Sequence, residues 1–203
     1  MTDPRNDGDL HIREKYSDLA REVLNRQRVR LSGRPLSVLK TDAFNEAHKR
    51  SPIEDYAETA HVQLVENDEA VIAAARTNYP DLKIVLGDIR ALPFSDQAFD
   101  VILDLSTIDH VPDPPRAIRE YARCLRPGGA LCLVSWVHLG RATQQRPSAY
   151  GGMQYFFDCV ALRSFLAEHF WIEDGRILTP GLTGPYGGHD LTNVDVHAYL
   201  CRR

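Results

Sequence analysis

The chain has 203 residues, with 28 acidic and 24 basic side chains and a formal net charge of −4. The hydrophobic fraction of 43% and the charged fraction of 26% are ordinary for a globular domain, which excludes a disordered polymer, a collagen-like chain and a small disulfide scaffold. The charge balance gives no broad positive surface for phosphate backbones, so we expect no nucleic-acid partner.

The four cysteines are scattered and form no Cys-x-x-Cys pair. We therefore expect reduced thiols and no metal site. The first residues are polar, and the longest apolar run, 130–134, is far shorter than the roughly 20 residues that span a bilayer. These features predict a cytoplasmic protein with no signal peptide and no membrane partner.

A helix is predicted near the N-terminus, at residues 10–31. From Ile12 to Leu24, apolar residues recur at the spacing of one helical face, and the segment 32–35 ends the pattern. Two interpretations stay open: a helix that caps a cofactor, and a plain packing helix.

Short apolar runs then alternate with helical stretches. Alternation at this spacing predicts a Rossmann-like, doubly wound α/β fold with a mostly parallel sheet. The predicted strands are 36–39, 62–65, 83–86, 99–105 and 130–137. The predicted helices lie within 43–56, at 68–78 and from Asp113 onward, the last being terminated by 127–129.

The C-terminal third has a different character. We expect a polar loop or lid at 138–158, a helix at 159–169, a strand at 171–178 and a glycine- and proline-rich turn at 179–190. A last strand at 194–201 alternates in a way that suits an antiparallel partner. The whole is predicted to be one domain, with the N-terminal helix at 10–31, a core at 35–137, and a lid and strand hairpin at 138–203.

Polar side chains follow the predicted strands at their carboxyl ends, where ligands of such sheets bind. An acid after the second strand can hold a ribose diol, and one after the third can accept from an adenine amine. Each residue alone also fits a turn or a helix cap, but the array in register is more specific. Its members are Lys40, Thr41, Asp42, Glu66, Asn67, Asp88, Asp104, Leu105 and Ser106.

A run of consecutive motifs resembles one known family. The segments 65–71, 87–100, 109–114 and 123–129 are similar to the class I S-adenosylmethionine-dependent methyltransferases. The resemblance is to the small-molecule, type 11-like branch related to quinone-biosynthesis methyltransferases, and it covers roughly residues 60–137. It implies S-adenosyl-L-methionine as cofactor, a small-molecule methyl acceptor, and a seven-stranded sheet with a reversed hairpin at one edge.

The resemblance also implies roles for single residues. Glu66 would hold the ribose hydroxyls, Asp88 and Ile89 the adenine, and 104–106 would lie beside the methionine portion. His110 would border the acceptor and is the first candidate for a general base, since imidazole titrates near neutral pH. Asp109 is the second candidate. The alternative for His110 is a hydrogen-bonded helix-entry residue, and for Asp109 a turn former.

The first strand departs from the family pattern. The family has an acid and then a glycine-rich turn that presents free amides to the cofactor, whereas segment 38–47 contains no glycine. Lys40 stands where the acid is expected and Asp42 where the first glycine is expected. We hypothesise that Asp42 pairs with the methionine ammonium, and Lys40 or an arginine of the N-terminal helix with its carboxylate. The competing hypothesis is a non-catalytic binding or partner subunit that has lost the cofactor loop.

Overall fold

The computed structural model describes residues 5–48, 60–148, 152–186 and 189–203. The helices are α1 (Arg5–Arg30), α2 (Phe44–His48), α3 (Glu69–Asn78), α4 (Pro114–Cys124) and α5 (Cys159–Ala167), with one 3₁₀ turn, η2 (Ile108–His110). The strands are β1 (Leu36–Lys40), β2 (Ala60–Glu66), β3 (Lys83–Leu86), β4 (Phe99–Leu105), β5 (Leu125–His138), β6 (Gln144–Pro147), β7 (Met153–Asp158), β8 (Trp171–Tyr186) and β9 (His189–Arg202).

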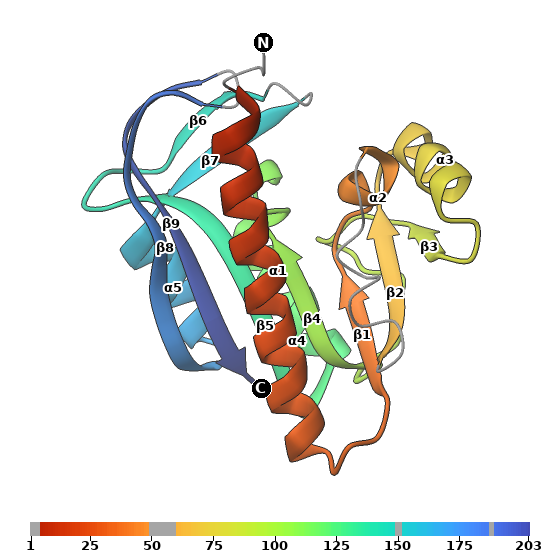
Figure 1. The fold of residues 1–203 in the computed structure, drawn as a ribbon. Helices are drawn as coiled ribbons and strands as arrows, with labels where there is room; N and C mark the ends of the chain where they lie inside the picture. The colour runs from red at the N-terminus through yellow and green to blue at the C-terminus, as the bar shows by residue number, and fades with distance from the viewer. Residues whose placement is uncertain (1–4, 49–59, 149–151, 187–188) are drawn as a thin grey trace.

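The strands form one twisted sheet with helices on both faces (Figure 1). Strands β1 to β5 are parallel in the order β3-β2-β1-β4-β5. The antiparallel strand β9 follows β5, and β8 closes that edge. These seven strands confirm the predicted doubly wound sheet with a reversed C-terminal hairpin. Strands β6 and β7 are an addition to it.

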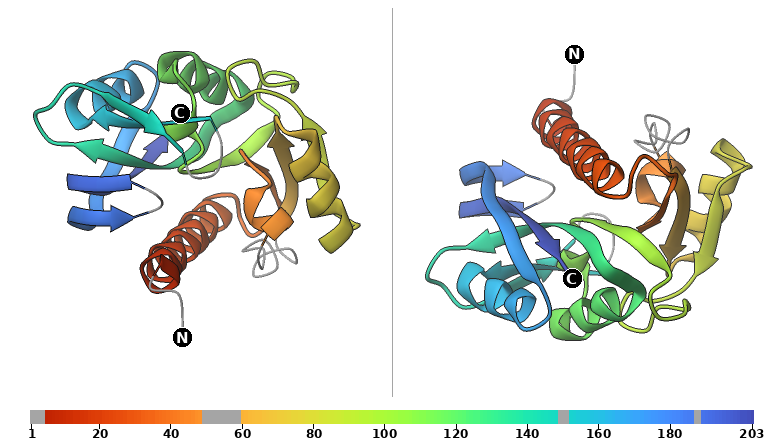
Figure 2. Two further views of the ribbon diagram at one scale, coloured as in Figure 1. Left: turned by 90° about the horizontal axis from the view of Figure 1, so that it is seen from above. Right: turned by 90° about the horizontal axis from the view of Figure 1, so that it is seen from below.

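Two apolar clusters fill the space on the two faces of the sheet. Helix α1 lies on one face, and α4 and α5 lie on the other (Figure 2). Leu19, Val23 and Leu24 of α1 join the first cluster, and Ile118 and Tyr121 of α4 join the second. Because strands β4 and β5 are covered on both faces, β4 is buried along its whole length.

Local capping explains where the core helices begin. The Asp68 carboxylate accepts hydrogen bonds from the amides of Ala70 and Val71 and thereby starts α3. Asp113 caps α4 by accepting from the Arg116 amide, with proline in the first turn. Since Asp68 lies only two residues beyond the end of β2, the cap fixes the chain direction there.

The predicted loop at 138–158 is wrong in part, because the structure has β6 and β7 there. Phe156 is buried in one apolar cluster and Phe157 in the other, the alternation of a strand. Strand β7 pairs in parallel with Val137 and His138 at the end of β5. The last β4 pairing on β5 is at Val134, so β7 continues the sheet where β4 has ended.

The turn predicted at 179–190 is wrong for 179–186 and 189–190, which lie in strands β8 and β9, and its residues 187–188 lie outside the described residues. The register between the two strands shifts twice between Thr179 and Gly184. The glycines and prolines thus mark bulges in an edge strand. Helix α4 ends at Cys124, and 127–129 lie within β5 at a register shift against β4. Among the described residues, no helix has the length and apolar character needed to cross a membrane.

Candidate functional site

The carboxyl ends of β1, β2 and β4 meet at one edge of the sheet. The end of β1 is paired with β2 on one side and β4 on the other, and the residues that follow bond across these strands. The Ala43 amide donates to Glu66 Oε2 (3.0 Å), and Thr107 Oγ1 donates to Asp42 Oδ2 (2.8 Å). The structure therefore brings together three of the predicted positions: the ends of the first, second and fourth parallel strands.

Lys40 is fully buried at the end of β1. Its ammonium donates to the Asp42 carbonyl (2.8 Å), to Asp42 Oδ1 (2.9 Å) and to Glu46 Oε2 (3.0 Å). Burial opposes the charge, but Asp42 and Glu46 outweigh it and raise the pKa of Lys40. Because all three ammonium hydrogens are used within the chain, a direct contact between Lys40 and a ligand would require one of these bonds to break.

Asp42 joins the loop after β1 to the end of β4. Its Oδ1 accepts from Lys40 and from the Phe44 amide, and its Oδ2 accepts from Thr107. Burial favours the neutral acid, but the Lys40 charge prevails and lowers the pKa of Asp42. Thr41 Oγ1 lies 2.8 Å from Thr107 Oγ1 and is buried beside it. The Asp42 side chain is 20% exposed, so the chain does not fully enclose this carboxylate.

Glu66 closes the end of β2. Besides the Ala43 amide, its carboxylate accepts from the amides of Asn67 (2.8 Å) and Asp68 (3.0 Å). Burial raises the pKa of Glu66 against the pull of these amides. Asn67 itself is exposed. Glu66 therefore holds the loop after β1 through the Ala43 amide. It also lies at the position where a ribose diol is expected to bind.

Asp88 lies next to Glu66, beyond β3. The Gly87 amide donates to the Glu66 carbonyl, and the Asp88 carboxylate forms an ion pair with Arg90 (2.6 Å). The Arg90 hydrogen bonds lower the pKa of Asp88. Ile89 is buried in the apolar cluster below.

Asp104 points into the protein. It accepts from the Tyr121 hydroxyl (2.6 Å) and from the amides of Thr107 and Ile108 (2.8 and 3.1 Å). Burial raises the pKa of Asp104 to about 7. Leu105 is also buried. Of the predicted segment 104–106, Ser106 alone is partly exposed, and it holds a left-handed backbone with φ of 82°.

Asp109 is fully buried behind Ser106. Its oxygens accept from Ser106 Oγ (2.5 Å), from Ser135 Oγ (2.5 Å) and from the Trp136 amide. Burial holds the pKa of Asp109 well above its usual range. His110 is exposed at the end of η2, against which β7 packs. The Ser106 hydroxyl thus links the buried Asp109 carboxylate to a partly exposed residue.

The sequence interpretation missed Glu46, Thr107 and Tyr121. One signal for Glu46 existed: a lysine that ends an apolar strand needs counter-charges nearby, and Glu46 follows Lys40 by six residues. For Tyr121 there was no such local signal, because its hydroxyl bond to Asp104 depends on the packing of α4 against β4.

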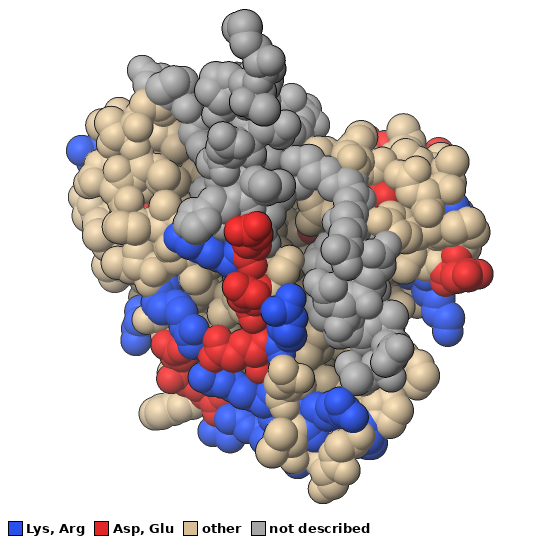
Figure 3. Space-filling view, viewed as in Figure 1, with Lys and Arg blue, Asp and Glu red and all other residues tan. Residues whose placement is uncertain are grey.

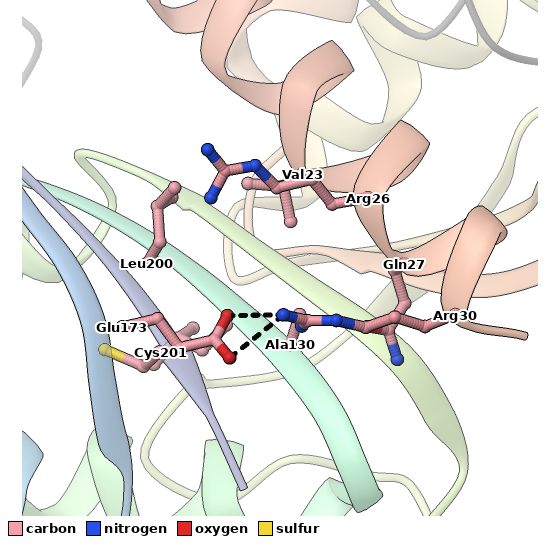
Figure 4. A pocket seen from close by; sticks show the side chains of 9 residues that line it. Val23, Arg26, Gln27, Arg30, Ala130, Glu173, Leu200 and Cys201 are labelled. Atoms are coloured by element: carbon pink, nitrogen blue, oxygen red, sulfur yellow. Dashed lines mark hydrogen bonds and ion pairs between the residues drawn. The ribbon is translucent and has the colours of Figure 1, made fainter.

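A small pocket elsewhere belongs to the packing of α1. It lies between α1 and the amino end of β5, where Arg30 bonds to Glu173 (Figure 4). The surface that carries α1 mixes acidic and basic side chains (Figure 3), several of them in ion pairs such as Glu22 with Arg26 and Arg176. Neither feature adjoins the carboxyl ends of β1 and β2.

One protein family matches the chain over residues 43–133, and its description is "Methyltransferase domain". The match begins at residue 43, within the glycine-free segment 38–47.

Curated relatives match a similar stretch. A probable S-adenosylmethionine-dependent methyltransferase of Mycobacterium tuberculosis is 37% identical over 71 residues, which are 35% of this chain and 26% of that protein. Demethylmenaquinone methyltransferase of Renibacterium salmoninarum is 31% identical over 68 residues, covering 34% and 29%. The chain thus spans only about a quarter of the length of the curated relatives it matches.

Solved structures share the fold over most of the chain. The 1,6-didemethyltoxoflavin-N1-methyltransferase of Burkholderia thailandensis, solved with S-adenosylhomocysteine, has a TM-score of 0.62 at 18% identity and covers 91% of this chain and 78% of its own. The cyclase SpnF has a TM-score of 0.64 at 18% identity, covering 90% and 80%. At these identities the likeness shows the fold, and the second example shows that the fold alone does not fix the reaction.

Proposed function

We propose that this chain, which carries the methyltransferase domain of the class I S-adenosylmethionine-dependent family, transfers a methyl group from S-adenosylmethionine to a small-molecule acceptor. The observation that carries the proposal is the meeting of Asp42, Glu66 and Asp88 at one edge of the parallel sheet. The relatives named for quinone-type acceptors support a small acceptor.

The donor set fits the nucleoside end of this cofactor. Glu66 supplies a carboxylate for the ribose hydroxyls. Its Oε1 accepts from the amides of Asn67 and Asp68, whereas its Oε2 accepts only from Ala43 and keeps a lone pair for a hydroxyl. Asp88 and Ile89 supply an acceptor and an apolar surface for the adenine. An exocyclic amine would share the Asp88 carboxylate with Arg90.

The methionine end is held differently from a glycine-rich turn. Asp42 Oδ2 bonds to Thr107 and retains capacity to accept from the cofactor ammonium. Lys40 acts as a positioning residue, since its bonds to Asp42 and Glu46 fix the loop that a glycine turn would otherwise form. This assignment replaces a direct bond from Lys40 to the cofactor carboxylate.

The acceptor is proposed to bind where Ser106, His110 and β7 meet. When bound, the cofactor supplies an activated sulfonium methyl group, so the protein mainly aligns the reactants and excludes water. His110 takes a proton from acceptors that must lose one. Asp109 holds Ser106 in its left-handed conformation and is a positioning residue.

Calorimetry with S-adenosylhomocysteine tests the cofactor site. Glu66→Gln and Asp88→Asn should each weaken binding by about 1.5–3 kcal/mol, the usual cost of losing a charged hydrogen-bond partner. Glutamine keeps one oxygen for the amides, so the fold should persist. Glu69→Gln, an exposed acid in the first turn of α3, is the matched control and should bind as the wild type does.

The same titration distinguishes the methyltransferase proposal from the competing hypothesis of a non-catalytic subunit. A folded wild-type protein that shows no heat of binding and no thermal stabilisation with S-adenosylhomocysteine would support a non-catalytic subunit. Binding that is unchanged in both variants would place the ligand elsewhere.

A further inference from the structure

A second group of chemically reactive side chains lies where α5 begins beside β9. Cys159 Sγ is 3.5 Å from His197 Nδ1 and 3.4 Å from the Tyr199 hydroxyl. On the other side of the ring, His197 Nε2 faces Asp195 Oδ2 at 3.6 Å. The methyl-transfer proposal uses none of these four residues.

The strand pairing fixes this arrangement. Asp195, His197 and Tyr199 are each two residues apart on β9. They therefore point to the same face of the sheet, the face covered by α5. Asp195 Oδ1 accepts from the Gly181 amide across the hairpin (2.6 Å), which holds its carboxylate in place. The histidine thus lies between a carboxylate and a thiol, the order in which a base activates a nucleophile.

Cys159 differs from the other three cysteines. Cys124, Cys132 and Cys201 are buried, whereas Cys159 is partly exposed. It is also the first residue of α5, whose N-cap is Asp158. Partial exposure and a neighbouring imidazole therefore coincide at Cys159.

The electrostatics of the cluster suit a base that is neutral at rest. Burial lowers the pKa of His197 in opposition to Asp195, so the ring is neutral at pH 7 and can accept a proton at Nδ1. Burial, followed by the contact with Cys159, raises the pKa of Tyr199, which therefore remains a neutral hydroxyl. Arg163 of α5 adds a positive charge near Tyr199.

We propose that Cys159 is a nucleophilic thiol, activated by His197 and Asp195, and that it forms mixed disulfides with low-molecular-weight disulfides. The thiol proton passes to His197 Nδ1 and the sulfur attacks one sulfur of the disulfide. The S–S bond breaks, a bond from Cys159 to that sulfur forms, and the departing thiolate takes the proton from His197. One thiol and one disulfide are consumed and one of each is formed.

The test treats the reduced, full-length chain with oxidised glutathione and follows the mass of the intact protein, with peptide mapping to locate the adduct. The expected result is one adduct, at Cys159, formed faster than on a free cysteine peptide. His197→Gln should slow it about tenfold, because the base that takes the thiol proton is removed. His61→Gln, an exposed histidine on β2, is the control and should leave the rate unchanged.

Asp195→Asn provides a second measurement if His197→Gln fails to fold. It keeps the ring and removes the charge that favours its protonated form, so the rate should fall severalfold. Equal rates in the wild type and the folded variants, a rate no higher than that of the peptide, or an adduct that forms first on another cysteine would each overturn the proposal.

Discussion

Lys40 shows how one residue changes the local architecture of a common fold. A buried ammonium is costly unless it is paired and fully hydrogen-bonded. Here Asp42 and Glu46 provide the counter-charges and the Asp42 carbonyl provides the third acceptor. The loop after β1 is thereby held by ionic contacts between side chains instead of by a tight glycine turn.

Replacing Lys40 with methionine should destabilise the protein. Lys40→Met leaves two carboxylates without their partner, one of them fully buried, and we expect a loss of about 3–5 kcal/mol in the free energy of unfolding. Adding Glu46→Gln should recover part of the loss because it removes the buried charge. Urea denaturation measures both variants, and Lys83→Met at an exposed position on β3 is the control. A Lys40→Met protein as stable as that control would contradict the ionic cluster.

Asp104 predicts a pH dependence of stability. Its pKa is raised to about 7 in the folded protein, whereas an unfolded aspartate titrates near pH 4. Between about pH 4 and about pH 7 the folded state holds the extra proton, so stability falls as the pH rises through this window. Asp104→Asn cannot ionise, and its free energy of unfolding should therefore fall less over the same window. Parallel denaturation curves for the two proteins at all pH values would refute this.

At the scale of elements, α1 illustrates how a polar helix is held by a narrow apolar stripe. Leu19, Val23 and Leu24 are buried against the sheet. Hydrogen bonds hold the helix to the sheet on either side of these residues. Lys15 donates to the Leu178 carbonyl of β8 (2.7 Å), and Gln27 donates to the Gly128 carbonyl of β5 (2.9 Å). The helix therefore tethers the bulged edge hairpin to the parallel core.

Alanine substitutions on the buried and the exposed face of α1 should differ in their effect on stability. Leu24→Ala removes a side chain that is 3% exposed and should lower the free energy of unfolding by about 2–5 kcal/mol. Val29→Ala, at 81% exposure in the same helix, should change it by less than about 0.5 kcal/mol. Thermal or urea denaturation compares the pair. Similar losses in both variants would mean that α1 does not pack on the sheet through this stripe.

At the scale of the whole molecule, the sheet brings distant parts of the chain to one edge. Parallel pairing places the ends of β1, β2 and β4 side by side, so Asp42, Glu66 and Thr107 meet although they are far apart in sequence. Strand β7 then occupies the position beyond β4, next to η2. Within the segment expected to be a loop or lid, residues 144–147 and 153–158 are thus strands of the sheet.

The parallel core was predictable because its signals are local. Apolar runs and turn chemistry within a few residues predict strands 83–86 and 99–105, the helix start at Asp113 and the C-terminal antiparallel strand. The segment 171–186 was harder, since its glycines and prolines favour a turn locally. Pairing with β9 converts them into bulges.

The sequence by itself determined the doubly wound fold, the carboxyl ends of the parallel strands to within one residue, and the family motifs. Each of these depends on residues close together in the chain. The tertiary structure decided which polar groups remain accessible. Asp104 and Asp109 have the same side chain as Asp42, yet they turn inward to Tyr121 and to Ser106 and Ser135, while Asp42 stays at the surface. The physical reason is that burial and hydrogen-bond partners come from packing between distant elements, and residue type alone does not specify that packing.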